Sequence, residues 1–157
     1  MSPILLFITT AFIIGIVSLV FLRNAKRLQW VLLFLVSGFS LFTALRFQGY
    51  WSEPESIING FSVLTVQNTP FGWIFFTITS GVMVLISIFS LSYNDEKHST
   101  GIAPFWTLLL GASAGIFFAA DWITFLIAWE IMGWTSFFII SHGKERSFKA
   151  GIYYFAL

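Results

Sequence analysis

A single glutamate interrupts one of the most apolar stretches of the chain. Residues 125–140 read FLIAWEIMGWTSFFII, and Glu130 is the only charged residue among them. Insertion scales assign a charged residue at the centre of a membrane-spanning helix a cost of about 2.5 to 3.5 kcal/mol. That cost can be met by protonation, by a basic partner or by water in the protein interior.

The chemistry open to such a carboxyl is proton or ion transfer. Removal from water favours the protonated form of a carboxyl, whereas a nearby cation favours the ionised form. Glu130 could therefore load and release a proton if it faces a switchable cation, and intramembrane acids are functional by default. The alternative is a protonated glutamate that hydrogen-bonds a neighbouring helix. Residues 122–140 contain no basic side chain, so the partner of Glu130 must lie on another helix or chain.

Helical spacing predicts what surrounds this carboxyl. Gly133 would leave room beside Glu130 for a close helix or for water. Trp129 and Trp134 lie deep in the run, whereas the other tryptophans lie near the predicted interfaces as anchors. These two indoles could shape a cavity around Glu130. The apolar side chains predicted on the same side are those of Ile123, Leu126, Ile127 and Phe137.

Three polar residues flank the run and are weaker candidates for an ion pathway. Asp121 precedes it, either as the N-cap of the following helix, which is the favoured interpretation, or as a pathway mouth. His142 and Lys149 follow it and could relay or admit protons. For both, an exposed or snorkelling side chain at the membrane surface is the favoured interpretation.

Several kinds of chemistry have no residues to support them. The chain has no cysteine, which excludes disulfides and thiolate ligands for a metal or an iron–sulfur cluster. The two histidines, His98 and His142, are far apart in the sequence, and no phosphate-binding or dinucleotide-binding motif is visible. No basic run indicates nucleic-acid binding. We therefore expect no metal, cofactor or redox chemistry in this chain.

Composition predicts an all-α bundle of transmembrane helices. Of the 157 residues, 57% are hydrophobic and only 10% are charged, whereas soluble domains carry about 25% charged residues. The mean hydropathy of +0.87 agrees with a membrane protein. Since about 20 apolar residues cross a bilayer, the apolar runs predict five spans and the start of a sixth. They cover residues 3–22, 28–45, 70–93, 102–119, 122–140 and 148–157.

The division between the fourth and fifth spans follows from length. A single helix over residues 102–140 would be about 58 Å long, roughly twice the hydrocarbon thickness, so the chain must reverse at Asp121. The small residues from Gly111 to Gly115 predict close helix packing, with the fifth span as the expected partner. The sixth run stops after about three turns, and we expect a longer protein of which this is the N-terminal portion.

The connections predict an orientation. Residues 48–69 form a polar loop, and the alternation in FSVLTVQ (residues 61–67) predicts a short strand or hairpin arm there. Seven of the eight basic residues follow the first, third and fifth spans: Arg23, Lys26, Arg27, Lys97, Lys144, Arg146 and Lys149. By the positive-inside rule the N-terminus and the loop 48–69 should lie outside the cytoplasm. The first span lacks the features of a cleaved signal peptide and should be retained.

The run DWITFLIAWEIMGWTSFFII resembles the fifth transmembrane helix of a known family. That family comprises the antiporter-like subunits of respiratory complex I, Mrp cation/proton antiporters and membrane-bound hydrogenases, which share a Trp-Glu pair here. Trp129 and Glu130 match the pair, and residues 94–121 resemble the preceding loop and helix. The details WEIMGWTSFF and KAGIYY resemble most the hydrogenase-4 and formate hydrogenlyase branch. Asn68 and Tyr153 depart from the family by replacing an aspartate and a lysine.

The resemblance implies a fold of about fourteen helices with inverted repeats, of which this chain would be the N-terminal part. It implies that Glu130 pairs with a lysine on a later helix, outside this chain. The implied function is proton or sodium translocation in a redox-driven complex, such as NADH:quinone oxidoreductase or an energy-converting hydrogenase, in a prokaryotic inner membrane. The implied partners are lipid, other integral membrane subunits, and peripheral subunits carrying iron–sulfur, flavin or nickel–iron centres. The alternatives are a structural membrane anchor and a part of a Mrp-type antiporter.

Overall fold

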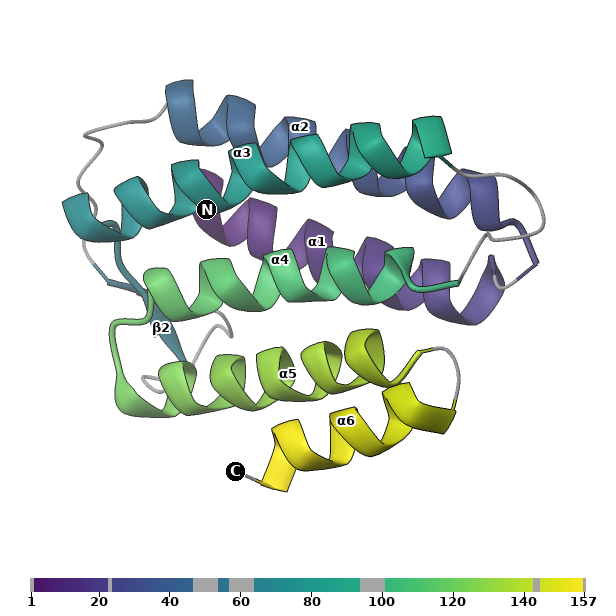
Figure 1. Cartoon of the computed structure of the whole chain (residues 1–157). Helices are drawn as coiled ribbons and strands as arrows, with labels where there is room; N and C mark the ends of the chain where they lie inside the picture. Colours follow the sequence, from purple (N-terminus) through teal and green to yellow (C-terminus); the bar gives the residue numbers. More distant parts are fainter. Residues whose placement is uncertain are drawn as a thin grey trace.

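The chain folds as a bundle of helices, as the composition predicts (Figure 1). The computed structural model describes residues 2–22, 24–46, 54–56, 64–93, 101–142 and 145–156. Its elements in chain order are α1 (Pro3–Phe21), α2 (Lys26–Arg46), β1 (Glu55–Ser56), β2 (Thr65–Val66), α3 (Pro70–Tyr93), α4 (Ala103–Phe117), α5 (Trp122–Ser141) and α6 (Glu145–Ala156). Among the described residues, four helices are long and apolar enough to cross a membrane: α1, α2, α3 and α5.

The fourth helix is shorter than the span expected over residues 102–119. It has 15 residues, so its length is about 22 Å, less than a hydrocarbon core of about 30 Å. The cause lies at its C-terminus, where Phe118 caps the helix and Ala119 forms an antiparallel bridge with Val66 of β2. Pairing with a strand requires extended backbone, so the helix cannot continue through this segment.

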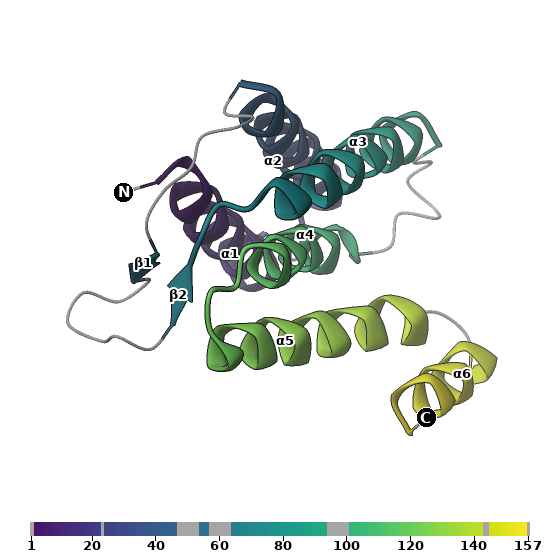
Figure 2. The same cartoon turned by 90° about the vertical axis from the view of Figure 1, so that its left-hand side faces the viewer.

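The helices alternate in direction and share two ends. The connections α2–α3 and α4–α5 lie at one end with β1 and β2, which we call the hairpin end, and the other connections lie at the opposite end (Figure 1). Figure 2 looks onto the hairpin end and shows α5 beside α4, with α6 outermost. The central helix is α4, which contacts α1, α2, α3 and α5.

The core is aromatic where α1, α3 and α4 meet. Phe7, Phe76 and Phe118 are fully buried. The ring of Phe76 lies edge-on to the other two, with centroids 5.2 Å from Phe7 and 5.5 Å from Phe118, a favourable geometry for aromatic pairs. This cluster fixes the end of α4 from which α5 departs.

The small residues of α4 face two helices, not only the fifth span as expected. A Cβ on Gly115 would lie 3.0 Å from the Cβ of Ala128 in α5, but one on Gly111 would lie 3.1 Å from the Cβ of Ala11 in α1. Gly111 and Gly115 are four residues apart and lie one turn apart on the same side of α4. Because α4 contacts both α1 and α5, one turn of this side meets α1 and the next meets α5.

The final helix begins earlier than expected. The sixth apolar run was predicted from residue 148, whereas α6 begins at Glu145 and has 12 residues. Of the basic residues that predicted the orientation, Arg23, Lys97 and Lys144 lie outside the described residues. The same holds for His98 and for much of the loop 48–69.

Candidate functional site

One face of α5 is fixed against the rest of the bundle. Thr124, Ala128 and Thr135 are its buried residues, and their spacing of four and seven places them on one side of the helix. Ala128 meets Gly115 of α4 closely. Nearer the opposite end, the rings of Phe105 and Phe138 stack with their centroids 5.0 Å apart.

Glu130 lies on the other face, near the middle of the helix. It is the ninth of the 20 residues of α5, and its side chain is exposed. Within the described ranges, no hydrogen bond or ion pair reaches Glu130. The space beside it is also open, because a Cβ on Gly133 would have no neighbour within 4 Å. The helix therefore presents its carboxyl away from the helices that this chain packs around α4.

The two deep tryptophans do not enclose Glu130 as the sequence predicted. Trp129 is 54% exposed and Trp134 is 48% exposed. Each contacts an aromatic ring of its own helix: Trp129 lies edge-on to Phe125 at 5.4 Å, and Trp134 lies edge-on to Phe137 at 6.3 Å. Nearer its C-terminus this face is covered by α6, where a Cβ on Gly151 would lie 3.4 Å from the ring of Phe137. Around Glu130 itself the described helices leave the face open, so a cavity there would need residues from another helix.

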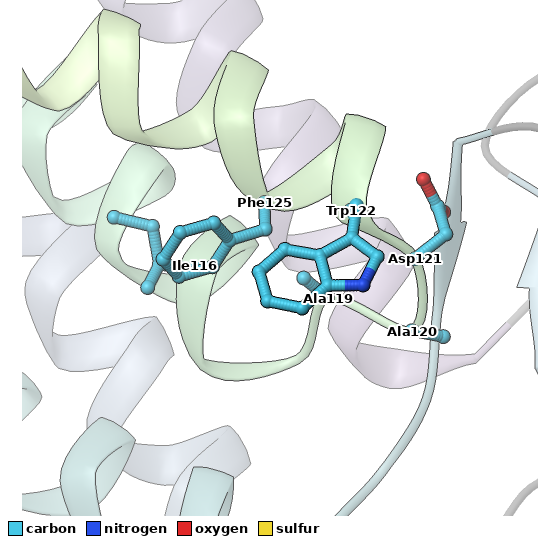
Figure 3. A pocket seen from close by; sticks show the side chains of 6 residues that line it. All are labelled: Ile116, Ala119, Ala120, Asp121, Trp122 and Phe125. Atoms are coloured by element: carbon cyan, nitrogen blue, oxygen red, sulfur yellow. The ribbon is translucent and has the colours of Figure 1, made fainter.

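A hollow of about 370 Å³ does lie beside α5, at the hairpin end. The rings of Trp122 and Phe125 lie together next to Ile116, and the carboxylate of Asp121 lies at the edge of the group (Figure 3). The hollow is lined by Ile116, Ala119, Ala120, Asp121, Trp122 and Phe125. Its wall is mainly apolar because every lining residue except Asp121 has an aliphatic or aromatic side chain.

Asp121 is the N-cap of α5, which confirms the favoured interpretation of this residue. Its Oδ1 accepts hydrogen bonds from the backbone N–H groups of Ile123 at 2.9 Å and Thr124 at 2.8 Å. Its Oδ2 accepts three more, from the Thr124 hydroxyl at 2.6 Å, the Thr65 N–H at 2.6 Å and the Thr65 hydroxyl at 2.8 Å. Burial alone would raise the pKa of Asp121, but the hydrogen bonds from Thr124 and Thr65 outweigh it and hold the pKa well below its ordinary range.

The strand that supplies Thr65 is bonded along the whole α4–α5 turn. The N–H of Ala120 donates to the Thr65 carbonyl at 2.9 Å, and the N–H of Gln67 donates to the Phe118 carbonyl at 2.8 Å. The predicted strand within FSVLTVQ is thus confirmed for residues 65–66. No local pattern in the sequence marks Thr65 as a functional residue, because its partner Asp121 is 56 residues away.

The other strand reaches the beginning of α1. Glu55 and Val66 are paired across β1 and β2, and the Glu55 Oε2 accepts a hydrogen bond from the Ser2 N–H at 2.6 Å. A hydrogen bond with the Ser2 side chain, and next this bond from the Ser2 backbone, lower the pKa of Glu55. Ser2 is in turn the N-cap of α1. The structure thus gives Glu55 a specific partner at the beginning of α1.

The remaining candidates lie far from Glu130 along α5. His142 caps the C-terminus of the helix with an exposed side chain. It lies 12 residues beyond Glu130, about 18 Å along the axis, whereas Asp121 lies nine residues before it, about 13 Å away. Lys149 is exposed on α6. The structure therefore does not bring Asp121 and His142 together with Glu130 into one cluster.

The chain is similar to an ion-transport subunit. Over 83 residues it is 30% identical to the "Na(+)/H(+) antiporter subunit A1" of Staphylococcus aureus (strain bovine RF122 / ET3-1). The similarity covers 52% of this chain but only 10% of that protein. No family model matches the chain. The apolar helices and this similarity support a multi-pass membrane protein.

Proposed function

We propose that this chain is part of a cation/proton antiporter-type membrane subunit and that Glu130 is its mid-membrane proton or charge site. The observation that carries the proposal is the position of Glu130, exposed near the middle of α5 on the face opposite its buried residues. The similarity to a sodium/proton antiporter subunit supports ion exchange as the chemistry.

The geometry suits a carboxyl that changes its charge state. One face of α5 is anchored on α4 through Ala128 and Gly115, so the helix can hold Glu130 at a constant depth. The open face beside Gly133 leaves room for a helix that carries a cation. When that cation approaches, the ionised form of Glu130 is favoured and its proton leaves; when the cation retreats, the carboxyl takes up a proton.

The partners follow from the same open face. Other integral membrane subunits, or further helices of the same protein, would complete the site. The prediction of a redox-driven complex, with peripheral iron–sulfur, flavin or nickel–iron subunits, depends on the sequence resemblance alone. The similarity to an antiporter subunit favours the antiporter type over the hydrogenase-4 branch.

The orientation is part of the proposal. Lys26 and Arg27 are exposed at the opposite end of the bundle, which agrees with a cytoplasmic location for that end. The hairpin end, with Asp121 and Glu55, would then face the outside of a prokaryotic inner membrane.

A transport assay on the whole assembled complex tests the proposal. Everted membrane vesicles would be energised, and the dissipation of the pH gradient on addition of Na⁺ would be followed with a fluorescent amine. We expect E130Q to abolish exchange with normal assembly, E130D to retain part of it, and the packing control W134F to behave nearly as wild type. Exchange at the wild-type rate in E130Q vesicles would overturn the role of Glu130. It would leave the structural-anchor alternative in its place.

A further inference from the structure

The carboxylate of Asp121 has no remaining capacity to bind an ion. Two carboxylate oxygens offer about four lone pairs, and five donors already point at them. A cation or proton at this position would have to displace donors that already bond to the carboxylate. Asp121 is therefore poorly suited to carry charge along a pathway, although it lies at the end of the glutamate helix.

Hydrogen bonds also hold the N-termini of three helices near the hairpin. Glu55 of β1 holds Ser2, the N-cap of α1. Directly after β2, the hydroxyl of Thr69 accepts from the N–H of Gly72 in the first turn of α3, at 3.1 Å. Thr65 of β2 holds Asp121, the N-cap of α5. Hydrogen bonds thus join the β1–β2 hairpin to the beginnings of α1 and α5, and α3 follows β2 directly in the chain (Figure 2).

Three aromatic rings lie one after another along α5 from this point to the residue before Glu130. The rings of Trp122 and Phe125 lie edge-on at 6.1 Å, and those of Phe125 and Trp129 lie edge-on at 5.4 Å. Trp129 is adjacent to Glu130 in the chain. Asp121 holds the N-terminus of α5, and Ala128 packs against α4 near the middle of the helix. The helix therefore cannot rotate or slide freely, so the direction of Glu130 is set.

We propose that Asp121 and Thr65 form a latch by which the extramembrane hairpin positions α5, and that Asp121 acts on transport only by placing Glu130. The effect of the latch on transport rests on the proposed function. The hydrogen bonds that link Thr65 to Asp121 do not depend on it. Asp121 and Thr65 are positioning residues in this account.

D121N separates the latch from the helix cap. Asparagine retains one oxygen to accept from the N–H groups of Ile123 and Thr124, and it is a good N-cap. Its amide group, however, would present donors to the Thr65 N–H, which is also a donor. Since a misplacement of about 1 Å can cost about 100-fold in rate, we expect at least a several-fold loss of Na⁺-dependent exchange. T65V, which removes only the hydroxyl bond, should show a smaller loss in the same direction.

A covalent substitute for the latch decides between positioning and conduction. Val66 and Ala119 are antiparallel bridge partners, so their Cα atoms are about 4.5 to 5.5 Å apart, within disulfide range. The chain has no native cysteine. In vesicles of the whole complex, the variant D121N/V66C/A119C should regain exchange after oxidation and lose it again after reduction. Its pH profile should match that of wild type, and the single variants V66C and A119C serve as redox controls.

The outcomes separate this inference from the proposed function. A cross-link that forms fully and leaves D121N transport impaired, or a pH profile displaced from wild type, would overturn the latch and make Asp121 a pathway residue. Slower cross-linking of V66C/A119C in D121N than in the Asp121 background supports the latch without any transport measurement. Equal cross-linking rates would contradict it. Full transport by E130Q would overturn the proposed function alone.

Discussion

The two acidic residues of the α5 region differ in almost every physical respect. Asp121 begins the helix and accepts five hydrogen bonds from the hairpin and the first turn. Glu130, nine residues later, is exposed and receives no bond from the described part of the chain. A carboxylate with all its acceptors in use stabilises a fold, whereas one that lacks partners at membrane depth is available for exchange. The contrast gives Asp121 a structural role and agrees with the proposed role of Glu130 in exchange.

The largest effect on stability is expected from D121A. Losing the N-cap costs about 1 kcal/mol, and leaving the Thr65 N–H without its acceptor costs about 1 to 3 kcal/mol more. We therefore expect about 2 to 4 kcal/mol of destabilisation and a lower yield of assembled protein. Thermal unfolding in detergent measures this, with E130A as the matched control that should unfold like wild type. An equal loss of stability in D121A and E130A would contradict the structural difference between the two carboxylates.

The two faces of α5 should differ in their tolerance of added volume. In G115V the side chain would press on Ala128, and overpacking of this kind costs about 1 to 3 kcal/mol. In G133V the added Cβ would meet no neighbour within 4 Å among the described residues. We expect G133V to preserve the folded chain but to block the approach of a partner helix, lowering exchange. Normal exchange with G133V would argue against a close partner on that face.

A smaller effect is expected from T65V. The variant removes the hydroxyl bond to Asp121 but keeps the backbone N–H bond. The loss should be about 0.5 to 1.5 kcal/mol, typical of one hydrogen bond. Thermal unfolding of T65V beside T65S, which retains the hydroxyl, measures it. A T65V effect as large as that of D121A would mean that the threonine contributes more than its bond to Asp121.

The smallest effect is the pH response of the latch. The folded pKa of Asp121 is lowered, so the carboxylate contributes stability above its unfolded pKa, about 3.9. That contribution is lost only as the pH falls through the lower folded value. The stability difference between wild type and D121N should therefore be constant from about pH 9 to pH 5 and shrink below about pH 4. A difference that shrinks between pH 6 and 8 would show that Asp121 titrates in the working range.

Much of the fold could be predicted because apolar runs and their polar breaks are local signals. The polar break at Asp121 predicted both the reversal of the chain and the N-cap, because a short acidic side chain directly before an apolar run is typical of a helix N-cap. The shortness of α4 could not be predicted, because it depends on Val66 pairing with Ala119 across 53 residues. The partner of Gly111 was missed for the same reason: α1 contacts α4 only in the assembled bundle.

The candidate site, too, could be predicted from the sequence only in part. The type and depth of Glu130 are evident from the sequence, because a charge in an apolar run is conspicuous wherever the run folds. The outward direction of Glu130 and the role of Thr65 depend on which face of α5 meets α4, and three buried residues decide that: Thr124, Ala128 and Thr135. The sequence favoured no face, because apolar residues occur all around this helix.

The most direct test of the central claim is cation-dependent proton exchange by E130Q and D121N in vesicles of the whole complex, with and without the Val66–Ala119 cross-link. We predict that cross-linking restores exchange to D121N and leaves E130Q inactive, because a covalent link can replace a positioning bond but cannot replace a proton-binding carboxyl. Exchange by E130Q at the wild-type rate, or a failure of the formed cross-link to restore D121N, would contradict the division of roles between the two carboxylates.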